Sequence, residues 1–245
     1  MRWGVVTFPG SNDDQTALRV AERVLGDVAV PLWHKDRDVA GVDCVLLPGG
    51  FSYGDYLRCG AMAKFSPIME AVVRHARAGG LVLGICNGFQ ILCEAGLLPG
   101  ALVRNRSLSF VCDVVTARVE TSDTPFTHGC RPGEVLALPI KHGEGCWVTD
   151  EATLAQLERD SRVVFRYVDR LGRVAPEANP NGALANVAGI CNAERNVLGL
   201  MPHPEYATER LTGGEDGLRI FRSVQAWVGR GRPSERHVPT LVPGP

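Results

Sequence analysis

A cysteine between two glycines is the residue of this sequence best placed to act as a nucleophile. The apolar run at residues 81–85 leads into the string GICNG (84–88) and then into a helical pattern. A strand, a sharp turn and a helix in this order form a nucleophile elbow, here with sulfur in place of oxygen. The glycines permit the turn, and the helix N-terminus favours a thiolate. We expect Cys86 to be strained, exposed above the sheet and reactive. The alternative is a packing turn around a buried cysteine.

A histidine and a glutamate follow a second apolar run, at residues 197–201. Pro202 and Pro204 push the residue before each of them out of the helical region, which holds His203 in an extended conformation. Side chains at i and i+2 of an extended chain point to the same side, so Glu205 can orient the imidazole. We expect a base and its orienting carboxylate. A surface turn with solvated side chains is the alternative.

Paired glycines end a third apolar run. Gly49 and Gly50, followed by Phe51, allow backbone amides to approach a ligand closely. In an open α/β sheet, ligands bind at the carboxyl ends of the strands, where all three motifs are expected to lie. We therefore expect one shared site, with the amide of Asn87 and one amide from residues 49–51 as an oxyanion hole. The implied chemistry is acyl transfer through a thioester.

The elements that must position these residues form an α/β pattern. Before residue 100, apolar runs alternate with helical periodicity, which is typical of βαβ units and a parallel sheet flanked by helices. After residue 105 the segments look extended, so we expect an open, mixed, mainly parallel sheet with antiparallel strands added in the second half. The strands are expected at 5–8, 28–32, 42–47, 81–85, 110–119, 135–140, 163–168, 182–187 and 197–201, and the helices at 17–25 (capped by Ser11 or Asn12), 62–76 (with Pro67 as an alternative start), directly after Cys86, 151–159 and 216–228.

Composition places limits on the class of protein. The 245 residues carry 26 Lys and Arg against 27 Asp and Glu, a net charge of -1, which gives no reason to expect nucleic acid or an anionic membrane as a partner. The longest apolar stretch, 78–86, is too short to span a bilayer. Eight cysteines without a C-x-x-C pair favour reduced thiols and a cytoplasmic protein. We expect residues 1–228 to form one domain, and 229–245, rich in Pro, Gly and Arg, to be a mobile tail.

Two kinds of cofactor chemistry find no support in the motifs. Both H-x-E strings, at 142–144 and 203–205, lack the P-C-x-x-C that completes the zinc site of deaminases. The sequence also has no phosphate-binding loop and no dinucleotide fingerprint. We therefore expect no metal and no ATP site in this chain.

Longer strings around these motifs resemble class I glutamine amidotransferases, and within them the glutaminase subunits of phosphoribosylformylglycinamidine synthase. The resemblance covers roughly residues 3–228, and FSYGDYLRCGA is its most specific part. The matching strings are PGSN (9–12), PGGFSYGDYLRCGA (48–61), GICNGFQIL (84–92), HGEG (142–145), VLGLMPHPE (197–205) and DGL (216–218).

The resemblance implies an activity and partners. Glutamine would be hydrolysed to glutamate through Cys86, His203 and Glu205, and the ammonia would pass to a separate synthetase subunit. That subunit would use ATP and Mg²⁺ to make phosphoribosylformylglycinamidine in purine biosynthesis, so this chain needs no cofactor. Whether a small third subunit bridges the two stays open. Two alternatives are a partner-independent cysteine hydrolase of γ-glutamyl compounds and a non-catalytic glutamine-binding regulator.

The resemblance also assigns further residues. Gln90, His142, Gly143 and Glu144 would line the glutamine pocket; for His142 a structural role in its loop is an equal alternative. For the partner interface the candidates are Tyr53, Asp55 and Arg58, in a loop that could instead fold only on itself. The chain departs from the family pattern at Asp13, Lys141 and Tyr206, where other residue types are usual.

Overall fold

The computed structural model describes residues 1–231, and a nine-stranded sheet organises them. The strand order is β2-β1-β3-β4-β11-β10-β9-β6-β7. The first five strands are parallel to their neighbours, and the pairs from β11 to β7 are antiparallel. This arrangement confirms the predicted mixed sheet with an added antiparallel part. The strands of the sheet are β1 (Arg2–Thr7), β2 (Val28–Trp33), β3 (Cys44–Leu47), β4 (Leu81–Ile85), β6 (Val111–Val119), β7 (Val135–His142), β9 (Val163–Val168), β10 (Val187–Cys191) and β11 (Val197–Leu200).

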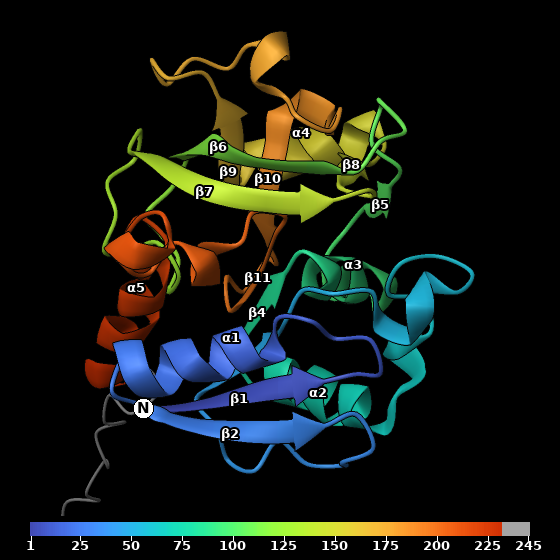
Figure 1. Cartoon of the computed structure of the whole chain (residues 1–245), viewed down its shortest axis with the longest axis vertical. Coiled ribbons are helices and arrows are strands. Elements are labelled where there is room, and N and C mark those ends of the chain that lie inside the picture. The colour runs from blue at the N-terminus through green and yellow to red at the C-terminus, as the bar shows by residue number, and fades with distance from the viewer. Residues whose placement is uncertain (232–245) are drawn as a thin grey trace, which may run out of the picture.

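Helices cover both faces of the parallel part. In Figure 1, α1 (Asp14–Arg19) lies in front of β1 and α2 (Pro67–Arg77) behind it. A π-helical turn, Val20–Val24, continues α1. Next to it lies α5 (Leu218–Gly229), whose Gln225 donates to the carbonyl of Leu25 at 3.2 Å. The fourth helix of this half, α3 (Asn87–Glu94), packs against β3, β4 and β11. Because both faces are covered, β3 and β4 are buried along their whole length, as in a doubly covered parallel sheet.

The antiparallel part forms the upper half of the molecule in Figure 1. Burial alternates along β7, which is the pattern of a strand with one face in the core. The helix α4 (Glu151–Arg159) begins after Asp150, whose carboxylate accepts a hydrogen bond from the Thr153 amide at 2.8 Å. Two short strands, β5 (Ala101–Val103) and β8 (Cys146–Val148), form a separate antiparallel pair. Sequence patterns did not indicate either, because three residues are too few for a periodicity.

Two predicted elements need correction. The strand expected at 182–187 is displaced: Leu184–Asn186 form a 3-10 turn, and β10 begins at Val187. Ala185 and Asn186 have φ values of 50° and 57°, which no strand residue adopts. The first helix is not capped by Ser11 or Asn12, since Asp13 occupies the N-cap position and its side chain does not cap the helix. Ser11 instead uses its hydroxyl to accept from the Phe8 amide at 3.0 Å.

The remaining boundaries agree with the patterns to within a few residues. The second helix begins at Pro67 and not at residue 62, since Pro67 takes the first helical position. Among residues 1–231, no helix has the length and apolar character that a membrane-spanning segment requires. The predicted tail lies almost wholly outside the described residues, because α5 extends to Gly229 and the description ends at residue 231.

Candidate active site

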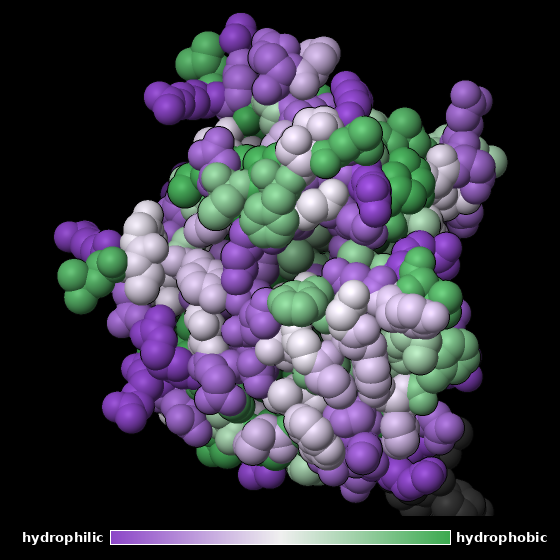
Figure 2. All heavy atoms as spheres, turned by 45° about the vertical axis from the view of Figure 1, so that its right-hand side comes forward, coloured by the Kyte–Doolittle hydropathy of each residue, from purple (hydrophilic) through white to green (hydrophobic). Residues whose placement is uncertain are grey.

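The three predicted motifs meet at one end of the sheet. Gly49 follows β3, Cys86 follows β4 and His203 follows β11, and these strands are adjacent and parallel. A cavity of about 370 Å³ opens there, a volume that suits a small molecule. Figure 2 shows that the surface is hollowed between the upper and lower halves of the molecule. The cavity is lined by Asn12, Asp13, Gly50, Phe51, Asp55, Cys59, Cys86, Gln90, Phe110, Lys141, His142, Gly143, Glu144 and His203.

Cys86 stands on the predicted strained turn. Its backbone has φ 51° and ψ -105°, a conformation that costs energy for any residue with a side chain. Gly88 permits the turn, because a Cβ there would lie 2.0 Å from the carbonyl oxygen of Leu47. The predicted exposure is wrong: only 5 % of Cys86 is accessible. The reason is that β7 passes close by, and the thiol lies 3.9 Å from the carbonyl oxygen of Lys141.

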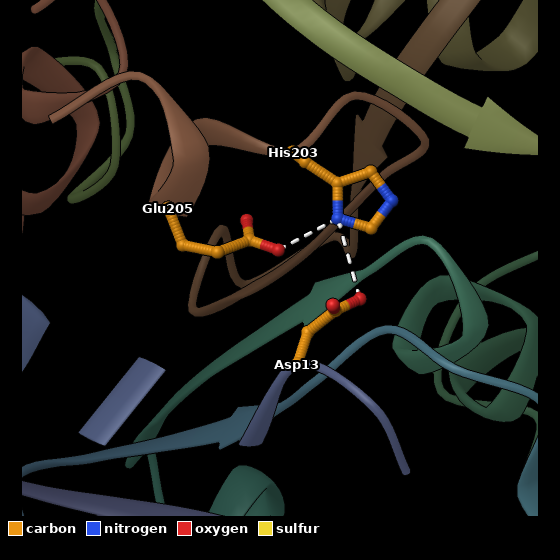
Figure 3. Close-up of side chains that lie close together, drawn as sticks. All are labelled: Asp13, His203 and Glu205. Carbon is orange, nitrogen blue, oxygen red and sulfur yellow. Dashed lines mark hydrogen bonds and ion pairs between the residues drawn. The ribbon is translucent and has the colours of Figure 1, made fainter. Parts of the chain in front are cut away.

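His203 and Glu205 form the expected pair. Nδ1 of His203 lies 2.6 Å from Oε1 of Glu205, and the two residues are 0 % and 1 % exposed. Burial lowers the pKa of His203, but Glu205 and Cys86 outweigh it and raise that pKa to about 10. In Figure 3 the other ring nitrogen, Nε2, points away from Glu205, and it has no hydrogen-bond partner among the described residues. Glu205 thus takes Nδ1, and Nε2 is left for the thiol of Cys86, which contributes to the raised pKa of the ring.

A second carboxylate approaches the same ring nitrogen from another direction (Figure 3). Oδ2 of Asp13 lies 3.6 Å from Nδ1 of His203, and Asp13 is 1 % exposed. Its other oxygen, Oδ1, accepts from Nζ of Lys141 at 2.5 Å and from the hydroxyl of Tyr206 at 2.7 Å. The sequence marked these three residues only as departures from the family pattern, and no motif links positions 13, 141 and 206.

The loop after β3 only partly fits the predicted oxyanion hole. The amide of Phe51 donates to the carbonyl of Gly10 at 3.0 Å, so it is already used. Asn87 begins α3, and the first amides of a helix have no partner inside the helix. Gly49 lies against the catalytic candidates, since a Cβ there would be 2.7 Å from Cε1 of His203. The amide of Asn87 and one from Gly49 or Gly50 therefore remain as candidate donors.

Gln90 lines the cavity as expected, within a buried chain of hydrogen bonds. Its Nε2 donates to the carbonyl of Glu144 at 2.6 Å, and its Oε1 accepts from Nδ2 of Asn87 at 2.8 Å. The Asn87 side chain also accepts from the amide of Ser52 at 3.1 Å. This chain connects α3, the loop after β3 and the loop after β7. It holds Gln90 and Glu144 at fixed positions on the cavity wall.

His142 lines the cavity and also has structural partners. Nδ2 of Asn181 lies 3.0 Å from its Nε2, and Nδ2 of Asn105 donates to its carbonyl at 2.8 Å. Burial, with a smaller effect of His203, lowers the pKa of His142 to about 4. Because Asn181 can only donate from Nδ2, His142 accepts at Nε2 and carries its proton on Nδ1. That atom has no hydrogen-bond partner among the described residues.

Asn105 and Asn181 were not predicted as site residues. Both are at most 1 % exposed, and both bind the backbone of Gly145, through its amide and its carbonyl respectively. They hold the loop of residues 142–145 from two distant parts of the chain. A lone asparagine carries no motif, so no local signal identifies either of them.

The three candidates for a partner interface separate in space. Asp55 lines the cavity, and burial raises its pKa, with Glu144 adding to the effect. Tyr53 lies outside it, with its hydroxyl 2.8 Å from Nδ1 of His34 and 2.9 Å from the Ser66 hydroxyl. Arg58 is at the surface and forms a two-bond ion pair with Glu94, at 2.6 and 2.8 Å. Only Asp55 is thus placed to contact a ligand in the cavity.

One group of side chains within residues 1–231 has the spacing of metal ligands. Asp13, His203 and Glu205 place three ligand atoms within 4.8 Å of one another. These groups are already engaged, since Glu205 pairs with Nδ1 of His203 and Lys141 pairs with Asp13. A cation there would compete with the ammonium of Lys141. The arrangement is that of an oriented imidazole, and we assign no metal to it.

Comparisons with known proteins agree with this site. A model of the CobB/CobQ-like glutamine amidotransferase domain matches residues 1–228. The chain is 57 % identical over 226 residues to "Phosphoribosylformylglycinamidine synthase subunit PurQ" of Gloeobacter violaceus, covering 92 % of this chain and 97 % of the relative. The PurQ subunit of Moorella thermoacetica is 55 % identical over 231 residues, 94 % of this chain and 98 % of the relative.

Solved structures show the same likeness. One structure of PurLQS from Thermotoga maritima superimposes with a TM-score of 0.82 at 42 % identity, over 93 % of this chain and 98 % of that chain. A glutamine amidotransferase from Thermotoga maritima, at 15 % identity and a TM-score of 0.52, covers 94 % of this chain and 83 % of that chain and shares the fold. The chain therefore belongs to the CobB/CobQ-like glutamine amidotransferase family, among the PurQ glutaminase subunits of phosphoribosylformylglycinamidine synthase.

Proposed function

We propose that this chain hydrolyses L-glutamine through a thioester on Cys86 and supplies the ammonia to a synthetase. The observation that carries the proposal is that the strained Cys86 and the buried, oriented His203 line one small cavity. A thiol and an imidazole that share a site form a thiolate and an imidazolium, the reactive pair of cysteine hydrolases. Glu205 holds the ring and stabilises its positive charge.

The reaction follows from this placement. The thiolate of Cys86 attacks the side-chain carbonyl carbon of glutamine, and the charge on the carbonyl oxygen develops towards the amides of Asn87 and of Gly49 or Gly50. The imidazolium of His203 gives its proton to the leaving nitrogen, which departs as ammonia. A water molecule then loses a proton to His203 and attacks the thioester, which releases glutamate and restores the thiol.

The amino-acid end of glutamine needs polar partners of its own. Oδ1 of Asp55 is buried on the cavity wall without a hydrogen-bond partner among the described residues, and Glu144 lies beside it. We assign the α-ammonium group of glutamine to these two carboxylates. Burial raises the pKa of Asp55 and the carboxylate of Glu144 raises it further, so a bound ammonium group would stabilise the ionised form of Asp55.

The ammonia acceptor is a separate ATP-dependent synthetase subunit that makes phosphoribosylformylglycinamidine, with ATP and Mg²⁺ bound there. The name PurLQS of the Thermotoga maritima structure supports an assembly with two further kinds of subunit. We assign one of them to the synthetase and the other to the small third subunit. We assign the docking surface to exposed apolar side chains in the segment after Asp55: Tyr56, Leu57 and Phe65 are 69 %, 78 % and 74 % exposed. Eight free cysteines fit a reducing compartment, the cytoplasm.

The experiment compares glutamate release by the isolated chain with release in the presence of the synthetase, ATP and its ribonucleotide substrate. We expect slow release alone and a large increase with the complete mixture, and no release with Cys86→Ala in either case. Full activity without the synthetase, extending to other γ-glutamyl compounds, would show a free-standing hydrolase instead. Glutamine binding without any release would show a regulator.

A further inference from the structure

We propose that Asp13 is a positioning residue for His203: it supplies a second carboxylate at the Nδ1 side of the imidazole, and Lys141 and Tyr206 set the orientation of that carboxylate. The inference rests on the proposed function, because it concerns the reactivity of Cys86 and His203. It goes beyond that function in adding a fourth charged group to the cysteine, histidine and glutamate. The observation that carries it is the arrangement in Figure 3.

The surrounding backbone fixes the position of the Asp13 side chain beside His203. Oδ2 lies 3.6 Å from Nδ1 of His203, in a residue that is 1 % exposed, and it has no hydrogen-bond partner among the described residues. Gly49 leaves the room for this approach, because a Cβ there would be 2.3 Å from Oδ2 of Asp13 and 2.7 Å from Cε1 of His203. The amides of Asn12 and Asp13 both bond to the carbonyl of Gly49, at 3.1 and 3.3 Å. The backbone thus fixes Asp13 against the ring.

Lys141 and Tyr206 bind only the other oxygen of Asp13. Nζ of Lys141 lies 2.5 Å and the hydroxyl of Tyr206 2.7 Å from Oδ1, and these two groups are 3.3 Å from each other. With Oδ1 occupied, Oδ2 is left to face His203. Lys141 comes from β7 and Tyr206 from the turn after His203, so the carboxylate is held from two elements.

The charged groups around the imidazole decide whether Asp13 raises or lowers the pKa of His203. His203 is faced by Glu205 and Tyr206 from its own turn, by Cys86 from the elbow, by Asp13 from the start of α1, and by Lys141 and His142 from β7. Oδ2 of Asp13 faces the ring, while the ammonium that balances its charge is bound to the other oxygen, Oδ1. The negative charge of Asp13 therefore favours the imidazolium.

Removing the charge of Asp13 should reverse this influence. In Asp13→Asn the ammonium of Lys141 stays near the ring without its partner and opposes the imidazolium. We expect the pKa of the His203 imidazolium to fall by about one unit, the lower end of the range for a charge within 4–6 Å. The double change Asp13→Asn with Lys141→Met removes both charges and should lower the same pKa by a smaller amount. Asp14→Asn is the matched control, since this neighbouring carboxylate bonds to the Thr7 hydroxyl at 2.9 Å.

The measurement is the pKa of His203, from the proton NMR signal of its Cε1–H against pH, assigned by the absence of that signal in His203→Ala. It needs no glutamine and no synthetase. The expected result is a fall of the midpoint in Asp13→Asn, a smaller fall in the double variant and no change in Asp14→Asn. A purely structural role for Asp13 would lower the melting temperature and leave the midpoint in place, which would overturn the inference.

The result also separates this inference from the proposed function. A wild-type Cys86 that reacts no faster with iodoacetamide at neutral pH than an ordinary thiol would contradict the proposed function itself. A reactive wild-type Cys86 with the same midpoint in Asp13→Asn would contradict only the role of Asp13. Should Asp13→Asn fail to fold, the double variant decides alone: a lower midpoint supports the inference, and an equal or higher one refutes it.

Discussion

Nδ1 of His203 lies 2.6 Å from Oε1 of Glu205, with both side chains at most 1 % exposed. A short bond between buried groups fixes the tautomer, because the carboxylate accepts the Nδ1 proton. Nε2 is then the only ring atom that can exchange a proton with the thiol or the substrate. Glu205 itself does not line the cavity, so its influence on the reaction passes through the ring.

Glu205→Gln should therefore damage turnover and spare binding. The amide can still fill the space, but it no longer compensates the charge of the imidazolium and it can stabilise the wrong tautomer. We expect kcat for glutamine hydrolysis to fall by roughly 10²- to 10⁴-fold, with KM changed less than about threefold. Steady-state kinetics of the complete complex check this.

The control for Glu205→Gln is Glu215→Gln, the same change at a side chain that is 53 % exposed and pairs with Arg210. This variant should keep the kinetic constants of the wild type. Equal losses of kcat and of affinity for glutamine in Glu205→Gln would mean that the carboxylate supports the architecture of the site and not the chemistry.

A glutamine-analogue alkylator should discriminate between two cysteines that line the same cavity. Cys86 and Cys59 both contact it, but burial together with Asp55 and Glu144 raises the pKa of Cys59 far above its usual range. Diazo-oxo-norleucine should modify Cys86 and leave Cys59 intact, and also leave the exposed Cys112 intact, since that thiol is outside the cavity. Peptide mapping after labelling tests this; label on Cys59 or Cys112 would contradict the assignment of the nucleophile.

The sequence could predict those parts of the site that lie within short strings. The elbow at Cys86 and the pair of His203 and Glu205 each lie within a few residues, and glycine explains the elbow. The extended chain predicted for the pair is wrong, because Pro204–Tyr206 form a 3-10 turn. Local patterns also predict β4 and α4, whose observed bounds are the predicted ones. Local rules suffice where the interacting groups are neighbours in the chain.

Contacts between distant segments could not be predicted in this way. Lys141 reaches Asp13 across 128 positions, and Asn181 reaches His142 across 39. Such pairs depend on the strand order and on the course of the edge strand β7, whose Lys141 lies near Cys86 and Asp13. Periodicity does not specify that order. The burial of Cys86 was missed for the same reason, because the covering carbonyl belongs to Lys141.

Gly88→Ala should destabilise the fold, because the added methyl group collides with backbone. Its Cβ would lie 2.0 Å from the carbonyl oxygen of Leu47, in the buried contact between α3 and β3. We expect the free energy of unfolding to fall by about 2–3 kcal/mol, the cost of overpacking a core. Urea denaturation measures the change. Gly229→Ala is the control: at the end of α5 a Cβ meets nothing within 4 Å among residues 1–231, so this variant should be neutral or slightly more stable. Equal stability of the two variants would mean that α3 can move away from β3.

His142 should make the protein sensitive to mild acid. Its pKa in the folded chain is lowered to about 4, first by burial and then by His203, whereas an unfolded chain has about 6.5. Between these values the unfolded state binds a proton that the folded state does not, so stability falls as the pH drops through this window and levels off below it. The lost free energy is about 3 kcal/mol, since one pKa unit corresponds to about 1.4 kcal/mol.

Removing the imidazole in His142→Gln should remove this part of the pH dependence. The measurement is the difference in unfolding free energy between wild type and His142→Gln, from urea denaturation at several pH values. We expect it to be constant above pH 7 and to shrink steadily towards pH 4, whereas a difference that does not vary with pH would show that His142 takes up its proton in the folded chain as readily as in the unfolded one.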